Sequence, residues 1–188
     1  VSYVNTSADV KAETDICCTS ANAVKVVESL GTKKVIFLPD DYLAKYVASQ
    51  TSVEIIAWKG ICMVHDQFNE KEINDIRDRN PGIKIIAHPE CPPEVIKASD
   101  FAGSTSGMIN YVKDNQPKKV MMVTECSMSD NIQVENPDVE FIRPCNRCPH
   151  MKKITLPKIL GCLKNETGEI IMDQETISKA RLSVEKMV

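Results

Sequence analysis

Short apolar runs rich in Val, Ile and Phe alternate with segments of helical period, and this alternation leaves few folds open to the chain. Strands that are separated by helices pair in parallel, so the pattern predicts an α/β fold with short, mainly parallel sheets. We expect strands at Val1–Asn5, Ile16–Thr19, Lys34–Leu38, Glu54–Trp58, Ile83–Ala87, Phe101–Gly103, Lys119–Thr124 and Glu140–Arg143. We expect helices at Ala8–Glu13, Ala21–Ser29, Asp41–Ala48, Glu70–Arg79, Glu94–Ala98, Ser106–Asp114 and Gln174–Val188, the last with Asp173 as its N-cap.

Composition excludes several classes of protein. The chain has 188 residues and a mass of 20.9 kDa, with 43% hydrophobic and 26% charged residues, as in a globular protein of one large or two small domains. A net charge of −3 and the absence of a basic tract argue against nucleic-acid binding. The longest apolar runs, such as Val35–Leu38, are far shorter than the roughly 20 residues of a membrane-spanning helix, so we expect no membrane insertion.

The chain has eight cysteines, which are few for a disulfide scaffold, and its sequence leads us to expect no signal peptide. We therefore expect a cytoplasmic protein with reduced thiols, whose cysteines serve a metal, a cluster or catalysis. The chain starts at Val1 inside an apolar stretch, which predicts that it is part of a longer protein.

The two halves of the chain can be laid over each other at a separation of 85 or 86 residues, with one single-residue gap after Ala12 and a compensating gap further along. The matching pairs are Lys11-Ala12 with Lys97-Ala98, Asp15 with Asp100, Ser20 with Thr105, Lys33-Lys34-Val35 with Lys118-Lys119-Val120, Ile55 with Phe141, and Cys62 with Cys148. The repeat predicts similar three-layer αβα units at residues 1–75 and 76–165, followed by a strand/helix tail at 166–188.

Cys145 and Cys148 form a C-x-x-C motif, which by itself fits a redox pair, half of a zinc site or two cluster ligands. In the repeat Cys148 matches Cys62, whereas Cys145 matches Lys59. A site shared by both units would therefore use Cys62 and Cys148 and leave Cys145 beside it. Both matched cysteines follow a predicted strand, where α/β folds place ligand-binding loops. Two cysteines alone are too few for a closed metal site.

The repeat also matches Ser20 with Thr105. Each hydroxyl follows a short predicted strand and precedes a predicted helix, whose free N–H groups and dipole can hold a carboxylate or a phosphate. An ordinary N-cap is the alternative use of such a residue. The pattern thus predicts either two anion-binding positions or two helix caps.

Several motifs together resemble one family, quinolinate synthase, the iron–sulfur enzyme of bacterial and archaeal de novo NAD biosynthesis. The motifs follow the family's order over nearly the whole chain, and the resemblance rests on their number and spacing. They are Tyr3-Val4-Asn5 with the Thr-Ser that follows and Lys11-Ala12, CTSANA from Cys18 to Ala23, KGIC-x-VH from Lys59 to His65, HPEC from His88 to Cys91, GSTSG from Gly103 to Gly107, and CNRCPHMKKITL from Cys145 to Leu156.

The resemblance implies three similar α/β domains around a pseudo-threefold axis, each giving one cysteine to a central [4Fe–4S] cluster. This chain would contain the last two domains, and by itself it is expected to be inactive. An iron without a protein thiolate would act as a Lewis acid. The implied reaction condenses iminoaspartate with dihydroxyacetone phosphate to quinolinate, with loss of phosphate and two waters. The resemblance further implies functional coupling to an L-aspartate oxidase.

The resemblance assigns roles to individual residues. It implies that Cys62 and Cys148 bind the cluster and that Tyr3, His88 and Glu90 are catalytic. The phenol would exchange a proton, the imidazole would polarise a carbonyl or hydroxyl, and the carboxylate would shuttle protons. Residues two apart on an extended strand end point the same way, so His88 and Glu90 are expected in one cleft. The implied substrate-binding residues are Tyr3, Val4, Asn5, Ser20, His88, Pro89, Glu90, Ser104 and Thr105.

The remaining cysteines and histidines receive structural interpretations. Cys17, Cys91 and Cys162 are interpreted as partly buried thiols. His65 and His150 are interpreted as neighbours of the cluster cysteines and not as ligands. The single tryptophan, Trp58, is expected to pack beneath the Cys62 loop.

Two other interpretations compete with a cluster enzyme. One is a non-catalytic α/β binding protein with a redox or zinc site at Cys145 and Cys148, in which Cys145 matters and Cys62 does not. The other is a Rossmann-type nucleotide binder, which is disfavoured because the chain has only seven Gly and neither a G-x-G-x-x-G nor a G-x-x-x-x-G-K motif.

Overall fold

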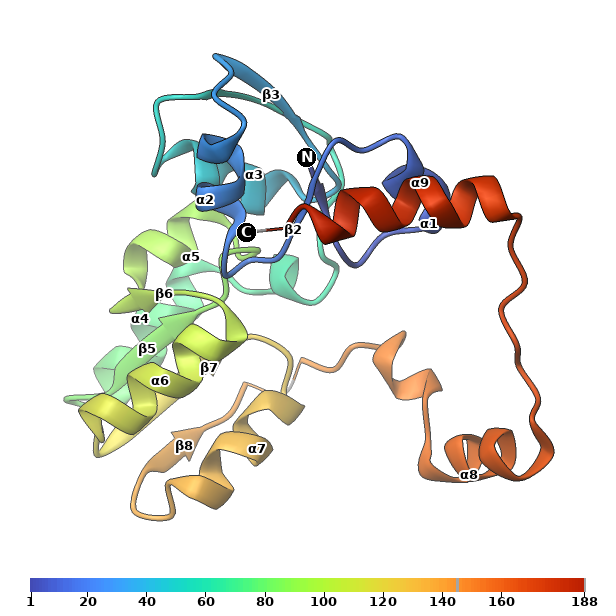
Figure 1. Cartoon of the computed structure of the whole chain (residues 1–188). Helices are drawn as coiled ribbons and strands as arrows, with labels where there is room; N and C mark the ends of the chain where they lie inside the picture. Colours follow the sequence, from blue (N-terminus) through green and yellow to red (C-terminus); the bar gives the residue numbers. More distant parts are fainter. Residues whose placement is uncertain (145, 188) are drawn as a thin grey trace.

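The protein is described by a computed structural model that covers residues 1–144 and 146–187 (Figure 1). Its strands are β1 (Ser2–Tyr3), β2 (Cys17–Cys18), β3 (Lys34–Phe37), β4 (Glu54–Ala57), β5 (Lys84–Ala87), β6 (Phe101–Ala102), β7 (Lys119–Val123) and β8 (Glu140–Ile142). Its α-helices are α1 (Ala8–Ala12), α2 (Ala23–Ser29), α3 (Asp41–Ala48), α4 (Glu70–Arg79), α5 (Pro93–Ala98), α6 (Thr105–Asn115), α7 (Ser127–Glu135), α8 (Leu156–Asn165) and α9 (Gln174–Glu185). Two short 3₁₀ helices are η1 (His65–Gln67) and η2 (Met151–Lys153).

The structure confirms the predicted α/β class. Each predicted strand is present in a shorter form, and every pairing between the described strands is parallel. Helices α3 and α4 have the predicted bounds, and each begins at an N-cap whose side chain accepts a backbone N–H: Asp40 accepts from Leu43, and Asn69 accepts from Glu72.

Two helices, α7 and α8, are absent from the sequence-based prediction. Helix α7 contains Ser, Asp and Asn residues that favour turns, and it buries only Ser129 and Ile132. Helix α8 buries no residue, although its apolar residues Leu156, Ile159, Leu160 and Leu163 follow the i, i+3, i+4, i+7 spacing of an amphipathic helix, a signal that the sequence-based prediction overlooked. In Figure 1, α8 lies apart from the sheets, on the segment that connects η2 to α9.

The strands follow the same spatial order in both halves of the chain. In the second half the order is β6, β5, β7, β8 within one sheet. In the first half, β1 pairs with β2 and β3 pairs with β4, and a parallel bridge between Ser2 and Leu38 places β3 beside β1. The first half therefore has the order β2, β1, β3, β4, which is the order of the second half with each strand number lowered by four. The division into units at residue 75 stays a prediction.

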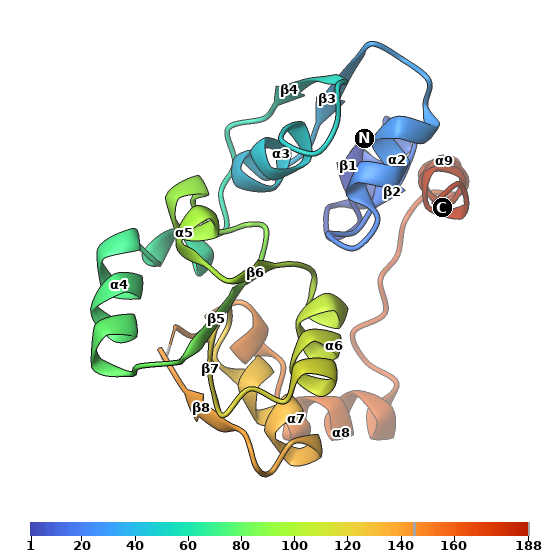
Figure 2. The same ribbon diagram turned by 90° about the vertical axis from the view of Figure 1, so that its left-hand side faces the viewer.

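Helices cover both faces of the second sheet (Figure 2). Alternate strand residues point to opposite faces, so Ile85 and Met121 pack with α4 and α5, whereas Ile86 and Met122 pack with α6 and α7. In the first half, one core joins α2 and α3 to β3 through Val35 and Phe37. The opposite face of β3 and β4 exposes large apolar side chains, namely Ile36, Ile56 and Trp58.

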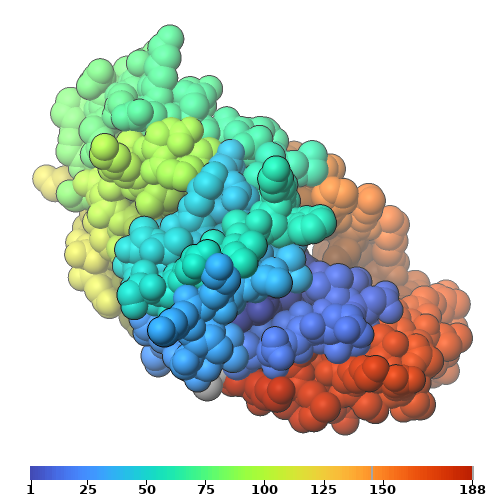
Figure 3. Space-filling model, turned by 90° about the horizontal axis from the view of Figure 1, so that it is seen from above, coloured from blue at the N-terminus to red at the C-terminus, as the bar shows by residue number. Residues whose placement is uncertain are grey.

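The C-terminal helix packs on the start of the chain. Helix α9 lies beside α1, as the red and blue segments of Figure 3 show. Ser183 is 1% exposed and donates its hydroxyl hydrogen bond to the carbonyl oxygen of Lys11 at 2.9 Å. Asp173 caps the helix as predicted, accepting from the Thr176 N–H at 2.8 Å. The structure has no strand among the described residues 166–187, where the sequence predicts a strand/helix tail.

None of the helices in residues 1–144 and 146–187 combines the length and the apolar character that crossing a membrane requires.

Candidate active site

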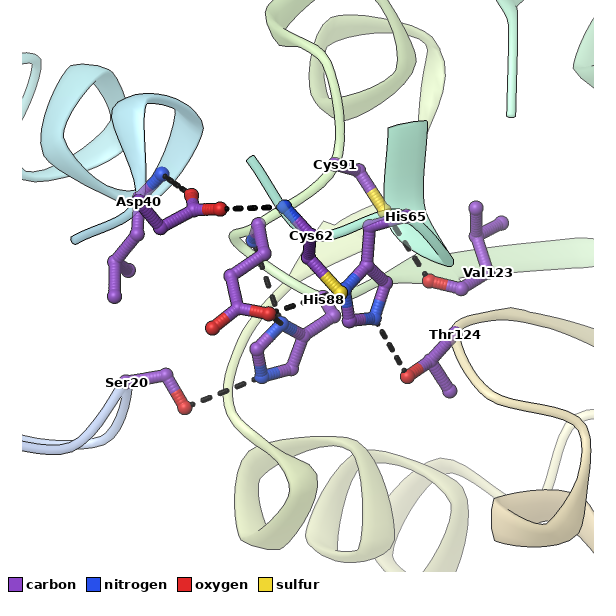
Figure 4. Close-up of polar contacts among 10 residues, drawn as sticks. Ser20, Asp40, Cys62, His65, His88, Cys91, Val123 and Thr124 are labelled. Atoms are coloured by element: carbon purple, nitrogen blue, oxygen red, sulfur yellow. Dashed lines mark hydrogen bonds and ion pairs between the residues drawn. The ribbon is translucent and has the colours of Figure 1, made fainter. Parts of the chain in front are cut away.

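Four loops at the carboxyl ends of parallel strands supply the side chains of one polar cluster (Figure 4). Cys62 and His65 follow β4, His88 and Glu90 follow β5, Thr124 follows β7, and Ser20 follows β2. The loops after β5 and β7 are tied together, because the His88 N–H donates to the Val123 carbonyl oxygen at 3.2 Å. Within a sheet, parallel strands bring their carboxyl ends to one edge, and the contacts of His65 with Thr124 and of His88 with Ser20 join the loops of the two halves there.

Cys62, His65 and Glu90 form the centre of the cluster. One thiol, one imidazole nitrogen and one carboxylate oxygen from these residues all lie within 4.8 Å of one another. His65 Nδ1 is 3.1 Å from Glu90 Oε2, which is an ion-pair distance, but the contact lacks hydrogen-bond geometry, so Nδ1 is a buried nitrogen without a hydrogen-bond partner among the described residues. His65 Nε2 lies 3.0 Å from Thr124 Oγ1. Three such donors, with one nitrogen unsatisfied, are a group that can hold a metal.

The contacts of His88 assign its tautomer. Its Nδ1 accepts the N–H of Glu90 at 3.3 Å, so in the neutral ring the proton sits on Nε2. That Nε2 lies 3.2 Å from Ser20 Oγ, to which it donates. The ring stacks on His65 with centroids 4.7 Å apart. His88 is therefore a fixed N–H donor that points toward Ser20.

The surroundings shift the pKa values of the two histidines in opposite directions. Burial lowers the pKa of His65, but the contacts with Cys62 and Glu90 outweigh it and raise that pKa to about 9. Burial lowers the pKa of His88 to about 4, and the neighbouring charge of His65 adds to this effect. Burial acts to raise the pKa of Glu90, yet the two histidines bring it below its usual range. The cluster at neutral pH is thus an imidazolium–carboxylate pair beside a neutral imidazole.

A pocket of about 220 Å³ opens beside the cluster, lined by Tyr3, Asn5, Pro39, Asp40, Gly60, Ile61, Cys62 and Glu90. Tyr3 stands at the end of β1, and burial raises the pKa of its phenol, with a further contribution from the Glu90 charge. Asp40 is 6% exposed, and burial raises its pKa to about 6. A small polar molecule in this pocket would meet a phenol, an amide, a thiol and a carboxylate.

The predicted anion-binding hydroxyls have different positions. The N-cap before α2 is Asn22 and not Ser20, so the Ser20 hydroxyl turns to His88. The N-cap of α6 is Ser104, whose hydroxyl accepts from the Gly107 N–H at 3.1 Å, while Thr105 is the first exposed residue of that helix. The expectation that both matched hydroxyls directly precede a helix is therefore wrong in detail. Among the described residues, no hydrogen bond joins Thr105 to the cluster.

Cys148 lies outside the Cys62 group. Its N–H donates to Glu125 Oε1 at 3.3 Å, and its Sγ accepts the Met151 N–H at 3.5 Å. Glu125 directly follows Thr124, the hydrogen-bond partner of His65, so the two cysteine loops share one connecting segment. The C-x-x-C alternative involves Cys145, which lies outside the described residues.

His88 and Glu90 do share one cluster, although a tight turn and not an extended strand end brings them there, since the Cys91 N–H donates to the His88 carbonyl oxygen at 2.9 Å. Pro89 is buried in the same turn, and Val4 is half-buried beyond β1. The predicted positions of Tyr3, Asn5, Ser20, His88, Glu90 and Cys62 thus lie around one site.

Sequence reasoning missed three members of the site. His65 was expected beside the cysteine, but its burial and its contacts with Glu90 and Thr124 place it at the centre. The C-x-x-H spacing from Cys62 is the signal that points to it. Asp40 and Thr124 each follow the carboxyl end of a strand, which is the position that marks site residues in parallel sheets.

Two predictions about neighbouring residues are wrong. Cys17 and Cys91 are fully buried, as a structural role requires, but Cys162 is exposed on α8, which packs against no core. Trp58 is 63% exposed and does not pack beneath the Cys62 loop, because it lies on the uncovered face of β4.

The fold and the site define an α/β protein with parallel sheets and a thiol–imidazole–carboxylate group, built around a buried histidine, that can hold a metal. Over residues 1–188 the chain matches the family described as quinolinate synthetase A protein. It is 60% identical to a quinolinate synthase of Sinorhizobium fredii over 188 residues, which are 100% of this chain and 52% of that protein. It is 56% identical to quinolinate synthase 1 of Mesorhizobium japonicum, covering 58% of that protein, and 55% identical to a quinolinate synthase of Xylella fastidiosa, covering 56%. The chain belongs to the quinolinate synthase family. It spans about half the length of the curated relatives that it matches.

A substitution at Gly60 tests whether the Cys62 loop must approach the backbone after β3 closely. A Cβ at Gly60 would lie 2.4 Å from the Pro39 carbonyl oxygen, which belongs to the backbone and cannot move aside cheaply. We expect Gly60→Ala to displace the loop and to cost about 1–3 kcal/mol in the free energy of unfolding, measured by urea denaturation. Gly161→Ala is the matched control, because a Cβ at this helical position meets nothing within 4 Å. A Gly60→Ala protein as stable as wild type would contradict the close approach.

Proposed function

We propose that this chain carries part of the active site of a quinolinate synthase, an enzyme of NAD biosynthesis that condenses iminoaspartate with dihydroxyacetone phosphate. Family membership over the whole chain supports this proposal. The observation that carries it is the Cys62, His65 and Glu90 group, of which Cys62 and Glu90 line a small pocket. A condensation with loss of water can use a Lewis-acidic metal together with groups that move protons, and the cluster has possible ligands for the first and candidate groups for the second.

The residues fit an iron–sulfur cofactor. Cys62 gives a half-exposed thiol at the pocket, and a nitrogen of His65 and a carboxylate oxygen of Glu90 lie close enough to it to form one set of metal ligands. Cys62 and Cys148 would be two of the cysteine ligands of a [4Fe–4S] cluster. When bound, such a cluster supplies a Lewis-acidic iron for substrate hydroxyl or carboxylate oxygens.

The chain's own residues would bind and orient the reactants. The His88 Nε2–H, which donates to Ser20 Oγ, is positioned to donate to a substrate carbonyl or hydroxyl oxygen. Asn5 and the Tyr3 phenol line the pocket and can donate to a carboxylate. Glu90 lies between the pocket and His65, so its carboxylate can take a proton from a substrate carbon and return it to a leaving oxygen. Ser104 and Thr105, at the start of α6, are proposed to bind the phosphate.

The proposed partners follow from the reaction. A cytoplasmic enzyme such as an L-aspartate oxidase would supply iminoaspartate. The competing C-x-x-C binding protein stays an alternative, because its first cysteine, Cys145, lies outside the described residues.

A chimera tests the proposed function. In the Sinorhizobium fredii relative, the 188 matching residues would be replaced by this chain. After anaerobic reconstitution with iron and sulfide, we expect the chimera to form quinolinate from iminoaspartate generated in situ and dihydroxyacetone phosphate, detected by liquid chromatography. The 188-residue chain alone should form none. A chimera without product, under conditions where the parent relative is active, would refute the proposal.

A further inference from the structure

Asp40 joins two structural elements through its two carboxylate oxygens (Figure 4). Oδ1 accepts the Leu43 N–H at 2.6 Å and so caps α3. Oδ2 accepts the Cys62 N–H at 3.0 Å, across 22 residues of sequence. The side chain is 6% exposed, so water cannot readily replace either bond. The backbone of the Cys62 loop is therefore held by a carboxylate that is itself fixed to a helix.

Glu125 accepts an equivalent pair of backbone hydrogen bonds in the second half of the chain. Its Oε2 accepts the Ser127 N–H at 2.8 Å, at the start of α7. Its Oε1 accepts the Cys148 N–H at 3.3 Å, across 23 residues. Glu125 is 9% exposed and stands 85 residues after Asp40, at the separation found for the internal repeat.

Backbone hydrogen bonds around the two carboxylates recur at the same separation. The Asp41 N–H donates to the Gly60 carbonyl oxygen at 2.7 Å, and the Cys126 N–H donates to that of Asn146 at 3.0 Å. The carbonyl oxygen of Cys62 accepts from the Asp66 N–H at 3.0 Å. In the second half, the Cys148 carbonyl oxygen accepts from the Lys152 N–H at 3.1 Å. Each cysteine is followed at three residues by a 3₁₀ helix, η1 or η2.

We propose that Asp40 and Glu125 are equivalent positioning residues, each of which holds the backbone of one cysteine loop so that the thiols of Cys62 and Cys148 are presented for a shared cofactor. Neither carboxylate needs to touch the cofactor. Each carboxylate accepts the backbone N–H of its cysteine, and this hydrogen bond fixes the backbone of the loop. The inference rests on the proposed function for the identity of the cofactor, but not for the hydrogen bonds.

A serine at position 40 separates the two roles of Asp40. Serine is as good an N-cap as aspartate, but one short hydroxyl cannot also reach the Cys62 N–H. In the 188-residue chain, amide hydrogen exchange measured by ¹H–¹⁵N NMR should rise about tenfold or more at Cys62 in Asp40→Ser, while the Leu43 N–H stays protected. In Glu125→Gln the same rise is expected at Cys148, because the one remaining oxygen would keep the shorter bond to Ser127.

The matched control is Asp173→Ser, an N-cap exchange at α9 with no cysteine attached, which should leave both cysteine amides unchanged. Asp40→Asn covers the case in which the serine variant unfolds, because its single carbonyl oxygen can again satisfy only one of the two N–H groups. Unchanged exchange at Cys62 and Cys148 in these folded variants would overturn the proposal.

A second readout connects the loops to the cofactor. In the reconstituted chimera, Asp40→Ser and Glu125→Gln should each lower bound iron per protein and speed the loss of cluster absorption on exposure to a chelator. Variants that retain iron as wild type does would overturn the positioning role. A wild-type chimera that takes up no iron would instead refute the proposed function, and the amide exchange would still decide whether the carboxylates hold the loops.

Discussion

Cys62→Ser is expected to abolish cluster binding in the reconstituted chimera. Iron–sulfur clusters are held by cysteine sulfur, which a serine hydroxyl does not replace as a ligand. Cys62 is also the one cysteine in the described chain that shares a group of possible metal ligands with a histidine and a glutamate. We expect the brown colour and the iron content to disappear and quinolinate formation to fall to background. Cys148→Ser should have the same effect, since Cys148 occupies the matching loop.

The other cysteines supply the controls for this result. Cys145→Ser should keep the colour and the iron, and so should Cys162→Ser, whose thiol is exposed on α8 and bonded only to the Thr167 carbonyl oxygen among the described residues. The reverse order, with Cys145 essential and Cys62 dispensable, would favour the binding protein with a C-x-x-C site. Iron measured by a colorimetric assay and visible absorption distinguish the two outcomes without any activity measurement.

The sequence predicts the strands well because they are local. Each strand is a short apolar run between turn residues, and parallel pairing follows from the helices between the runs. The ends are less predictable, because hydrogen bonds with neighbouring segments decide them. At the ends of β1 and β3, for example, the Leu38 N–H donates to the Val1 carbonyl oxygen, but the regular bonding of a strand does not extend to either residue. The position of α9 beside α1 depends on contacts such as Ser183 with Lys11, which no local pattern contains.

The membership of the candidate site was predictable in part, but its contacts were not. The resemblance indicates Cys62, His88 and Glu90, and the structure places them in one cluster with Tyr3 and Ser20 nearby. It could not indicate that His65 lies between Cys62 and Glu90, because a histidine near a cysteine in sequence can point to either side of a loop. The paired carboxylates Asp40 and Glu125 were hidden for a related reason. Their role appears only when each is seen to reach a cysteine more than 20 residues away.

Phe37→Ala is expected to destabilise the first half of the chain by about 3–5 kcal/mol, which is the usual cost of removing a buried aromatic ring. Phe37 is 0% exposed and packs in the core that joins β3 to α2 and α3. A domain of this kind is stabilised by only about 5–15 kcal/mol, so the loss is a large fraction of the whole. The free energy of unfolding from urea titration, followed by circular dichroism, measures this change.

Ile36→Ala is the matched control, because Ile36 precedes Phe37 on the same strand but points to the uncovered face and is 61% exposed. It should cost less than about 1 kcal/mol, as exposed substitutions usually do. Phe37 also lies two residues before Pro39, whose carbonyl oxygen contacts the Cys62 loop at Gly60, and three before Asp40, which holds that loop. Loss of the ring should therefore also speed amide exchange at Cys62, whereas Ile36→Ala should not. Equal stability of the two variants would show that Phe37 does not contribute to a core beneath β3. The inferred link between that core and the position of Cys62 would then fail as well.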